Sequence, residues 1–535
     1  MLLHALYAFA AAVLAYNLGR LFVPDRSFAM STALGLGILG EALFLLAALG
    51  LLTRWSVSGV LVLACFFVRR FVLPSPVWIA TAPAFLLALY PPTGFDATLY
   101  HLPFARLFAE TGRLAFADTL RFPVFPQLGE LLFSGAMLVT DDVTAQLTQW
   151  LALAVTTVAI ATMVERRAAI LAVALWLGTP LALYLGGNAY IDCSLTMFVT
   201  LAFAAYLQWR RSEERTWAVL AGAFAGFAAS TKYHGLFFVA VLLLAIAWKN
   251  RRAAAAFALV ALLLAGPWYA RIWAETGNPL FPYFSSIFGR HEWQTTLDQR
   301  LERTASHPMT AAPTENPLTA TIHRAIGDPL ANGMAPHSPW VVLLLPFAVV
   351  AAVREPRLRF PLGAALGYAL LVSPLDWRFM IAIVPLVCIG IAAGLPRMRH
   401  PAVLALVAVL LAAPGLAWST LLLYKYGPIP AAQQARDAFL AKRIPVYEAL
   451  RGRHEVVYLL HAENAHYYCP TRCLGEVYGP YRYAKVDPLL HDPARLAATL
   501  RGFGAEVVVL DKRRDALPLP RLFEGERGEA LAIGP

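Results

Sequence analysis

The sequence is poor in charged residues, which make up 14% of its 535 residues, whereas hydrophobic residues make up 59%. A soluble protein contains about a quarter charged residues, so this composition excludes an ordinary soluble enzyme. Apolar runs long enough to cross a bilayer recur from the N-terminus to about Leu422. We therefore predict an integral membrane protein.

Lysine is also scarce, and most of the 44 basic residues are arginine. A net charge of +11 would suggest nucleic-acid binding in a soluble protein. Here much of the excess charge lies in short loops between apolar runs, as in the cytoplasmic loops of membrane proteins. The partners that we expect are membrane lipids and no nucleic acid.

Cysteine occurs only five times. Cys65, Cys193 and Cys388 lie in or beside apolar runs, where small buried residues are expected. Cys469 and Cys473, in "YYCPTRC", would form a disulfide if their side of the membrane is oxidising, and the sequence leaves this open. A zinc site would need two more ligands, and none has a convincing spacing.

The N-terminus lacks the basic n-region of a signal peptide, so we interpret its apolar run as a first membrane span. In total the hydropathy pattern predicts about 13 or 14 membrane-spanning helices. The expected spans are residues 3–23, 29–52, 57–73, 75–91, 145–163, 168–186, 192–209, 217–232, 234–249, 253–273, 338–353, 360–375, 377–395 and 402–422.

Basic loops recur on one side of these spans, and we expect that side to be cytoplasmic. They are "ERR" at 165–167, "RRSEER" at 210–215, "KNRR" at 249–252, "REPRLR" at 354–359 and "PRMRH" at 396–400. The opposite side receives most of the Asp, His and aromatic residues. The expected location is a bacterial inner (plasma) membrane, crossed many times, with this polar side periplasmic.

Three regions are predicted along the chain. Extra N-terminal helices occupy residues 1–74, and a membrane core with external loops at 92–144 and 274–337 occupies 75–425. Residues 431–535 alternate predicted helices ("PVYEALRG", "PARLAATLRGFG") with buried strands ("HEVVYLLH", "GAEVVVLD"), which indicates a small periplasmic α/β domain. The short segment 126–140 is expected to be a juxtamembrane helix at the interface.

The first external stretch, "PPTGFDATLYHLPFARLFAETGRL" at 91–114, is unusually polar. In one interpretation Asp96 caps the next helix while Tyr100 and Arg106 anchor it at the interface. In the other, Asp96 is a carboxylate at the floor of an outward-facing site.

This stretch resembles the first external loop of GT-C glycosyltransferases, in particular the family-39-like bacterial enzymes that include protein mannosyltransferases and the lipid A aminoarabinose transferase. Asp96, Tyr100 and Gly112 match the family's pattern, and the interfacial segment resembles "FPQLGELLF". Later motifs follow in the family's order: "NAYIDCSLTMF" with Asp192, "GFAASTKYHGLFF" with Lys232, and "DWRFMIAIVPLVCIG". The resemblance covers roughly residues 75–400. It departs at Ala97, where many members have a second acid.

The resemblance implies a polytopic helical fold and transfer of a sugar from a polyprenyl-phosphate donor to a lipid, glycan or protein acceptor, with inversion. Asp96 is the first choice for the catalytic base and Asp192 the second. The residues expected to bind the substrates, several of them cations that would hold the leaving phosphate, are Tyr100, His101, Arg106, Arg113, Glu130, Lys232, His234 and Arg378. No cofactor or metal ligand is assigned, although a divalent metal stays open; His291, Glu292 and His307 have no fixed spacing.

Other interpretations remain for these residues and for the chain. Asp192 could cap a helix, Lys232 could be a snorkelling anchor, and Arg378 could pair with Asp376. The chain could instead be an O-antigen-type polymerase or ligase, or a transporter or flippase of lipid-linked sugars. A transporter is expected to show two related halves, and we find no internal repeat.

Overall fold

The computed structural model describes residues 2–25, 27–66, 68, 75–120, 122–288, 335–372, 377–475 and 482–533. The chain divides into two compact units. Unit 1 comprises Met1–Tyr90, Pro126–Trp268 and Glu315–Ile429, and unit 2 comprises Pro91–Phe125, Tyr269–Thr314 and Pro430–Pro535. The polar stretch around Asp96 therefore groups with the C-terminal region, although the whole membrane core separates them in sequence.

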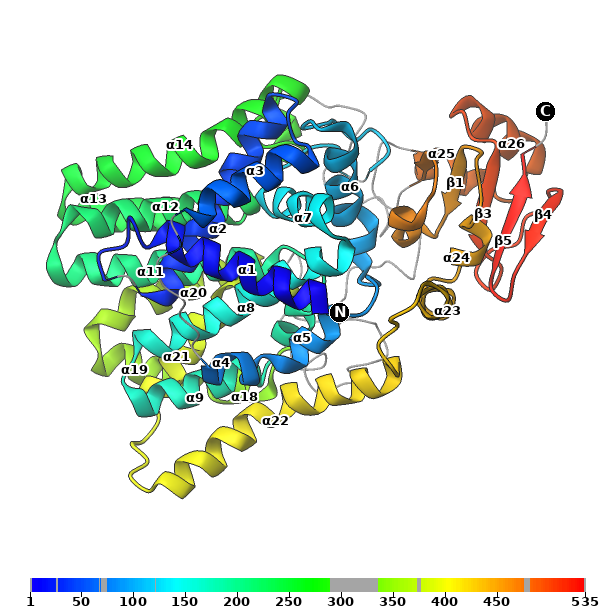
Figure 1. Cartoon of the computed structure of the whole chain (residues 1–535). Helices are drawn as coiled ribbons and strands as arrows, with labels where there is room; N and C mark the ends of the chain where they lie inside the picture. Colours follow the sequence, from blue (N-terminus) through cyan, green and yellow to red (C-terminus); the bar gives the residue numbers. More distant parts are fainter. Residues whose placement is uncertain are drawn as a thin grey trace. The chain divides into compact units, whose positions relative to one another are not determined.

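Unit 1 is a bundle of helices (Figure 1). Its elements are α1 (Leu2–Gly19), α2 (Phe28–Ala48), α3 (Arg54–Cys65), α4 (Ser75–Ala80), α5 (Ala82–Ala88), α7 (Leu128–Val139), α8 (Asp142–Met163), α9 (Arg166–Leu177), α10 (Pro180–Gly186), α11 (Asp192–Ser212), α12 (Arg215–Thr231), α13 (Gly235–Lys249), most of α14 (Arg251–Thr276), α18 (Pro339–Leu343), α19 (Leu345–Arg354), α20 (Pro356–Val372), the 3₁₀-helix η3 (Trp377–Ile383), α21 (Val384–Gly394) and α22 (Pro401–Tyr426).

Small residues let these helices approach closely. This is usual in membrane proteins, because helices surrounded by lipid associate by close packing rather than by the hydrophobic effect. At Gly35 in α2, an added Cβ would lie 1.9 Å from the carbonyl oxygen of Ala15 in α1. The two backbones are thus in contact, and only glycine fits at this crossing.

By length and hydropathy, five of the described helices could cross a membrane: α2, α8, α14, the combined Trp377–Gly394 and α22. The pair α9 and α10, bent by 72°, would make a sixth. Other expected spans correspond to apolar helices of 10–17 residues, among them α1, α3, α13 and α19. The predicted class, a multi-pass helical membrane protein with a small C-terminal sheet, is confirmed, whereas these criteria assign fewer spans than the hydropathy pattern predicted.

Two predicted continuous spans are interrupted. Residues 75–91 form α4 and α5, with Pro83 in the first turn of α5, and residues 168–186 bend where Pro180 begins α10. Proline lacks a backbone donor and disfavours helical geometry in the residue before it, which explains both breaks.

Unit 2 contains a five-stranded sheet, coloured orange to red in Figure 1. Its described elements are the π-helix η1 (Ala97–His101), α6 (Leu102–Thr111), the end of α14, α15 (Ser285–Phe288), α23 (Gln433–Arg443), α24 (Tyr447–Leu450), β1 (Val457–Leu460), the 3₁₀-helix η4 (Glu463–Tyr468), β2 (Cys473–Leu474), α25 (Arg482–Val486), the 3₁₀-helix η5 (Asp487–Leu489), α26 (Pro493–Gly502), β3 (Val507–Asp511), β4 (Arg521–Glu524) and β5 (Gly528–Ala532).

The strand order is β2-β1-β3-β5-β4, with β1 parallel to β2 and β3, and β5 antiparallel to β3 and β4. Strands β1 and β3 are buried along their whole length, as their apolar runs predicted. The expected helix in "PVYEALRG" is only the single turn α24, because Gly452, at φ 69°, turns the chain soon afterwards. Leu496 and Leu500 of α26 pack on the sheet with Val508.

Candidate active site

In unit 1 the two expected site residues Asp192 and Lys232 form an ion pair. The Lys232 Nζ lies 3.0 Å from Oδ1 of Asp192, and the two side chains are 15% and 1% exposed. Asp192 is the first residue of α11, directly after the N-cap residue Ile191. Its carboxylate is stabilised by Lys232 and by its place at a helix N-terminus.

Three basic side chains gather around the ring of Phe379 in η3. Lys232 Nζ lies 4.4 Å from the ring centroid, Arg378 Cζ lies 5.2 Å from it, and the two ring centroids of His234 and Phe379 are 4.4 Å apart. The guanidinium of Arg378, a buried residue, also lies 5.3 Å from the ring centroid of Tyr190. Aromatic faces stabilise cations that have left water, so the ring of Phe379 holds Lys232 and Arg378 where an anion such as a phosphate could bind.

Glu130 is fully buried in the first turn of α7. The preceding residue, Gly129, lies so close to Ile191 that an added Cβ would be 2.5 Å from Cγ2 of that side chain. The start of α7 therefore packs against the residue that precedes Asp192. The segment expected at the interface is a short helix, as predicted, and most of it is buried within unit 1.

In unit 2 the structure brings Asp96, Tyr100 and His101 together. The Tyr100 hydroxyl donates a 2.9 Å hydrogen bond to Oδ2 of Asp96, and the Tyr100 and His101 ring centroids lie 4.2 Å apart. The Asp96 side chain makes no capping hydrogen bond at η1, so the interpretation of Asp96 as a helix cap is wrong. The segment is a π-helix, a rare geometry that is frequent at functional sites, and Asp96 and His101 are buried in it.

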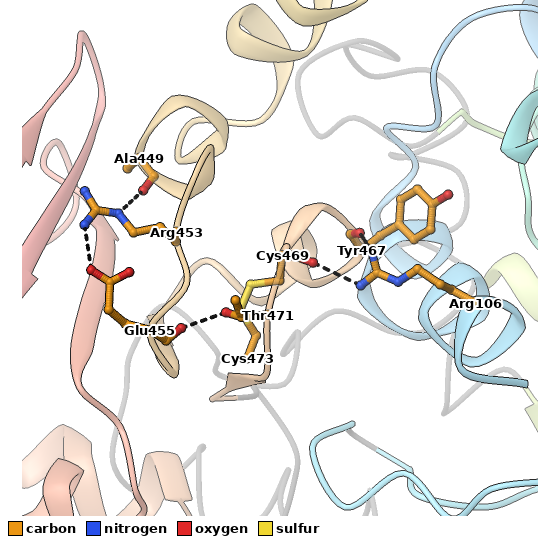
Figure 2. Close-up of a disulfide and its surroundings, with 8 residues drawn as sticks. All are labelled: Arg106, Ala449, Arg453, Glu455, Tyr467, Cys469, Thr471 and Cys473. Atoms are coloured by element: carbon orange, nitrogen blue, oxygen red, sulfur yellow. Dashed lines mark hydrogen bonds and ion pairs between the residues drawn. A yellow bond between two sulfur atoms is a disulfide. The ribbon is translucent and has the colours of Figure 1, made fainter. Parts of the chain in front are cut away.

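Two expected phosphate-binding cations lie further along this segment. Arg106 donates hydrogen bonds to two main-chain carbonyls, those of Tyr467 at 2.7 Å and Cys469 at 3.1 Å (Figure 2). Arg113 is exposed just beyond Gly112, whose φ of 68° ends α6. The guanidinium of Arg106 thus binds backbone of the C-terminal region.

Cys469 forms a disulfide with Cys473 (Figure 2). The sequence left this bond open because it depends on the compartment. Cys193 and Cys388 are buried and free, as expected, whereas Cys65 is exposed.

Sequence reasoning missed a second ionic cluster, at the carboxyl ends of β1 and β3. His461 Nδ1 lies 3.0 Å from Oδ2 of Asp515, and its Nε2 lies 3.1 Å from Oδ1 of Asp487. Burial lowers the pKa of His461, but the hydrogen bonds and charges of the two aspartates outweigh it and raise that pKa to about 10. Burial raises the pKa of the neighbouring Glu463 to about 7. His461 ends one predicted strand and Asp515 follows the other, where polar residues commonly gather, and that was the available signal; Asp487 lies in η5 and carried none.

Other expectations concern residues outside the described part of the chain. These are Asp376, His291, Glu292 and His307. Within the described ranges, no group of three or more His, Cys, Asp or Glu residues is placed to hold a metal ion.

Two family profiles match the sequence. The family described as dolichyl-phosphate-mannose-protein mannosyltransferase matches residues 143–274, which include Asp192, Lys232 and His234. A second profile, described as SF2091/S2213, matches residues 435–523 in the C-terminal region. A comparison with curated protein sequences finds no match.

Solved structures with a similar fold include ArnT from Cupriavidus metallidurans in the apo state, with a TM-score of 0.54 and 17% identity over 86% of this chain and 97% of that chain. ArnT from the same organism bound to undecaprenyl phosphate matches with a TM-score of 0.50 and 14% identity over 86% of this chain and 97% of that chain. ArnT and the mannosyltransferase family are GT-C membrane glycosyltransferases. The predicted resemblance is therefore confirmed: this chain has a GT-C membrane glycosyltransferase fold.

Proposed function

We propose that this chain is a membrane glycosyltransferase that moves a sugar from a polyprenyl-phosphate carrier to a lipid, polysaccharide or protein acceptor at the periplasmic face. The observation that carries the proposal is the cluster of Lys232, His234 and Arg378 around Phe379. A sugar that leaves a polyprenyl phosphate leaves a phosphate monoester behind. The cations Lys232 and Arg378, held against the ring of Phe379, would stabilise the charge that develops on that leaving group.

Attack by an acceptor hydroxyl also needs a base. Asp192 is already paired with Lys232, which would hold that lysine in place for the phosphate. Asp96 is hydrogen-bonded to a neutral tyrosine hydroxyl, so it keeps its place as the first choice for the base. Direct displacement, with the acceptor attacking opposite the phosphate, inverts the anomeric carbon.

Three findings support the donor class and the side of the membrane. The similarly folded ArnT binds undecaprenyl phosphate, which is the kind of lipid that the donor would carry. The disulfide Cys469–Cys473 suits an oxidising compartment such as the periplasm. The basic loops suit the cytoplasmic side.

The proposal is tested with purified protein in nanodiscs and a panel of undecaprenyl-phosphate sugars, with and without EDTA. The expected result is release of undecaprenyl phosphate from one donor in the presence of an acceptor. Loss of release with EDTA would add a metal to the mechanism. Specific lipid binding with no release from any donor would contradict the proposal, and lipid scrambling in vesicles would then favour a flippase.

A further inference from the structure

The contact of Arg106 with η4 is a specific clamp within unit 2. Two guanidinium nitrogens donate to different carbonyls at the end of η4: Nη1 to that of Tyr467 and Nη2 to that of Cys469, the first residue after η4. The carbonyls at a helix end have no partner within the helix and carry partial negative charge. The guanidinium carbon also lies 5.2 Å from the Tyr467 ring centroid. Lysine could not reproduce this arrangement, because it has no planar fork of donors.

The clamped loop is itself tied to the sheet. Cys469, which accepts one of the two Arg106 bonds, is disulfide-bonded to Cys473 at the start of β2. Between the two cysteines, the Thr471 hydroxyl donates a 2.7 Å bond to the carbonyl of Glu455, just before β1 (Figure 2). The disulfide therefore fixes the end of η4 to the edge of the sheet.

The end of η4 also contacts the chain on the N-terminal side of Asp96. The Tyr468 hydroxyl donates a 2.5 Å bond to the carbonyl of Pro92, four residues before Asp96. Since η1 continues directly into α6, Asp96 lies between two attachments, one at Pro92 and one at Arg106. A surface ion pair of Arg472 with Asp118 adds a third contact, although both side chains are more than half exposed.

We infer that Arg106 is a positioning residue rather than a phosphate ligand, and that the oxidised Cys469–Cys473 loop holds the Asp96 segment in its reactive geometry through it. This inference rests on the proposed function of Asp96. A small displacement of a reacting group can reduce the rate by about 10- to 100-fold. The C-terminal domain would thus act on the rate while it contributes no reacting group, and it would do so only when the disulfide is formed.

The test compares Arg106→Gln, Arg106→Lys and the double variant Cys469→Ser/Cys473→Ser with wild type in nanodiscs. Arg495→Gln is the matched control, because Arg495 is an exposed arginine of the same domain outside the clamp. Two quantities are measured: sugar transfer, separated into kcat and the KM for the donor, and hydrogen exchange of the amides of residues 97–106.

Positioning predicts that Arg106→Gln lowers kcat by about 10- to 100-fold with little change in donor KM, and speeds exchange across 97–106. Arg106→Lys should behave like Arg106→Gln. The double cysteine variant should show the same two changes, and adding Arg106→Gln to it should cause little further loss, because both act through one contact.

A rise in donor KM that Arg106→Lys restores would overturn the inference in favour of phosphate binding. Unchanged exchange in Arg106→Gln would overturn it as well, even if the double cysteine variant fails to fold. The exchange measurement does not depend on catalysis. Faster exchange in a protein that transfers no sugar would therefore support the clamp while contradicting the proposed function.

Discussion

Unit 1 and unit 2 both hold charged side chains away from bulk water, wholly or in part, but these side chains have different partners in the two units. In unit 1 the charges meet one another and aromatic rings: Lys232 pairs with Asp192, and Lys232 and Arg378 lie against Phe379. In unit 2 the charge of Arg106 meets two main-chain carbonyls, with the largely exposed carboxylate of Glu110 at 3.9 Å. In the proposed function the first arrangement binds a phosphate, whereas in our inference the second holds the Asp96 segment in place. Two arginines with the same expected role thus differ because of their partners.

The largest stability effect is expected where the ion pair of unit 1 is broken. Lys232→Met leaves the carboxylate of Asp192 buried without its lysine, which should cost about 3–5 kcal/mol. The double variant Asp192→Asn/Lys232→Met removes both charges and should recover most of this loss. The midpoint of thermal unfolding in detergent measures both. Equal midpoints for wild type and Lys232→Met would show that the pair contributes no stability.

Unit 2 also holds a partly buried histidine, His461, and its contribution to stability should depend on pH. Because Asp487 and Asp515 raise its pKa in the folded state to about 10, protonated His461 stabilises the fold fully below its unfolded pKa of about 6.5. This contribution is lost as the pH rises from about 6.5 to about 10, and on the order of 2 kcal/mol is expected after allowance for its partial exposure.

The thermal midpoint of the full chain should therefore fall over this range, and His461→Gln should remove that part of the dependence. Glu463 contributes in a separate, lower window, from about pH 4.5 to about 7, because burial raises its pKa and its charged form destabilises the fold. An unchanged profile in His461→Gln would contradict the assigned ion pairs.

How much of this was predictable varies from residue to residue. Asp192 and Lys232 lie at the ends of consecutive apolar runs on the same side, so the sequence places them together. The breaks at Pro83 and Pro180 also carried a local signal, which the hydropathy windows averaged away. By contrast, Arg106 and Tyr467 are 361 residues apart in the sequence, and no local pattern joins them. Phe379 follows Arg378, which was predicted, but its contacts with Lys232 and His234 depend on where α12, α13 and η3 meet in the fold.

Removal of the disulfide should lower the free energy of unfolding by about as much as loss of the ion pairs of His461. The loop between Cys469 and Cys473 is short, so Cys469→Ser/Cys473→Ser should lower the stability of the sheet domain by about 2 kcal/mol. Hydrogen exchange of the β1 and β3 amides checks this value. The native protein treated with reductant should match the double variant once the buried disulfide has reacted. Unchanged exchange of these amides in both samples would show that the disulfide does not stabilise the sheet.

The smallest effect is expected at the surface. The Arg472–Asp118 pair is 58% and 57% exposed, so Arg472→Ala should cost about 1 kcal/mol or less and leave sugar transfer nearly unchanged. The same thermal midpoint and transfer assay apply. A loss as large as that of Arg106→Gln would mean that the exposed pair, and not the clamp, holds the Asp96 segment.

The most direct single measurement is the rate of sugar transfer by Asp96→Asn at saturating donor and acceptor. Asp492→Asn, at the N-terminus of α26, is the control. If Asp96 is the base, the rate should fall by about 10²- to 10⁴-fold while binding of undecaprenyl phosphate and the thermal midpoint stay close to those of the wild type. Transfer at the wild-type rate by Asp96→Asn would contradict the role of the Asp96 segment as the floor of the active site.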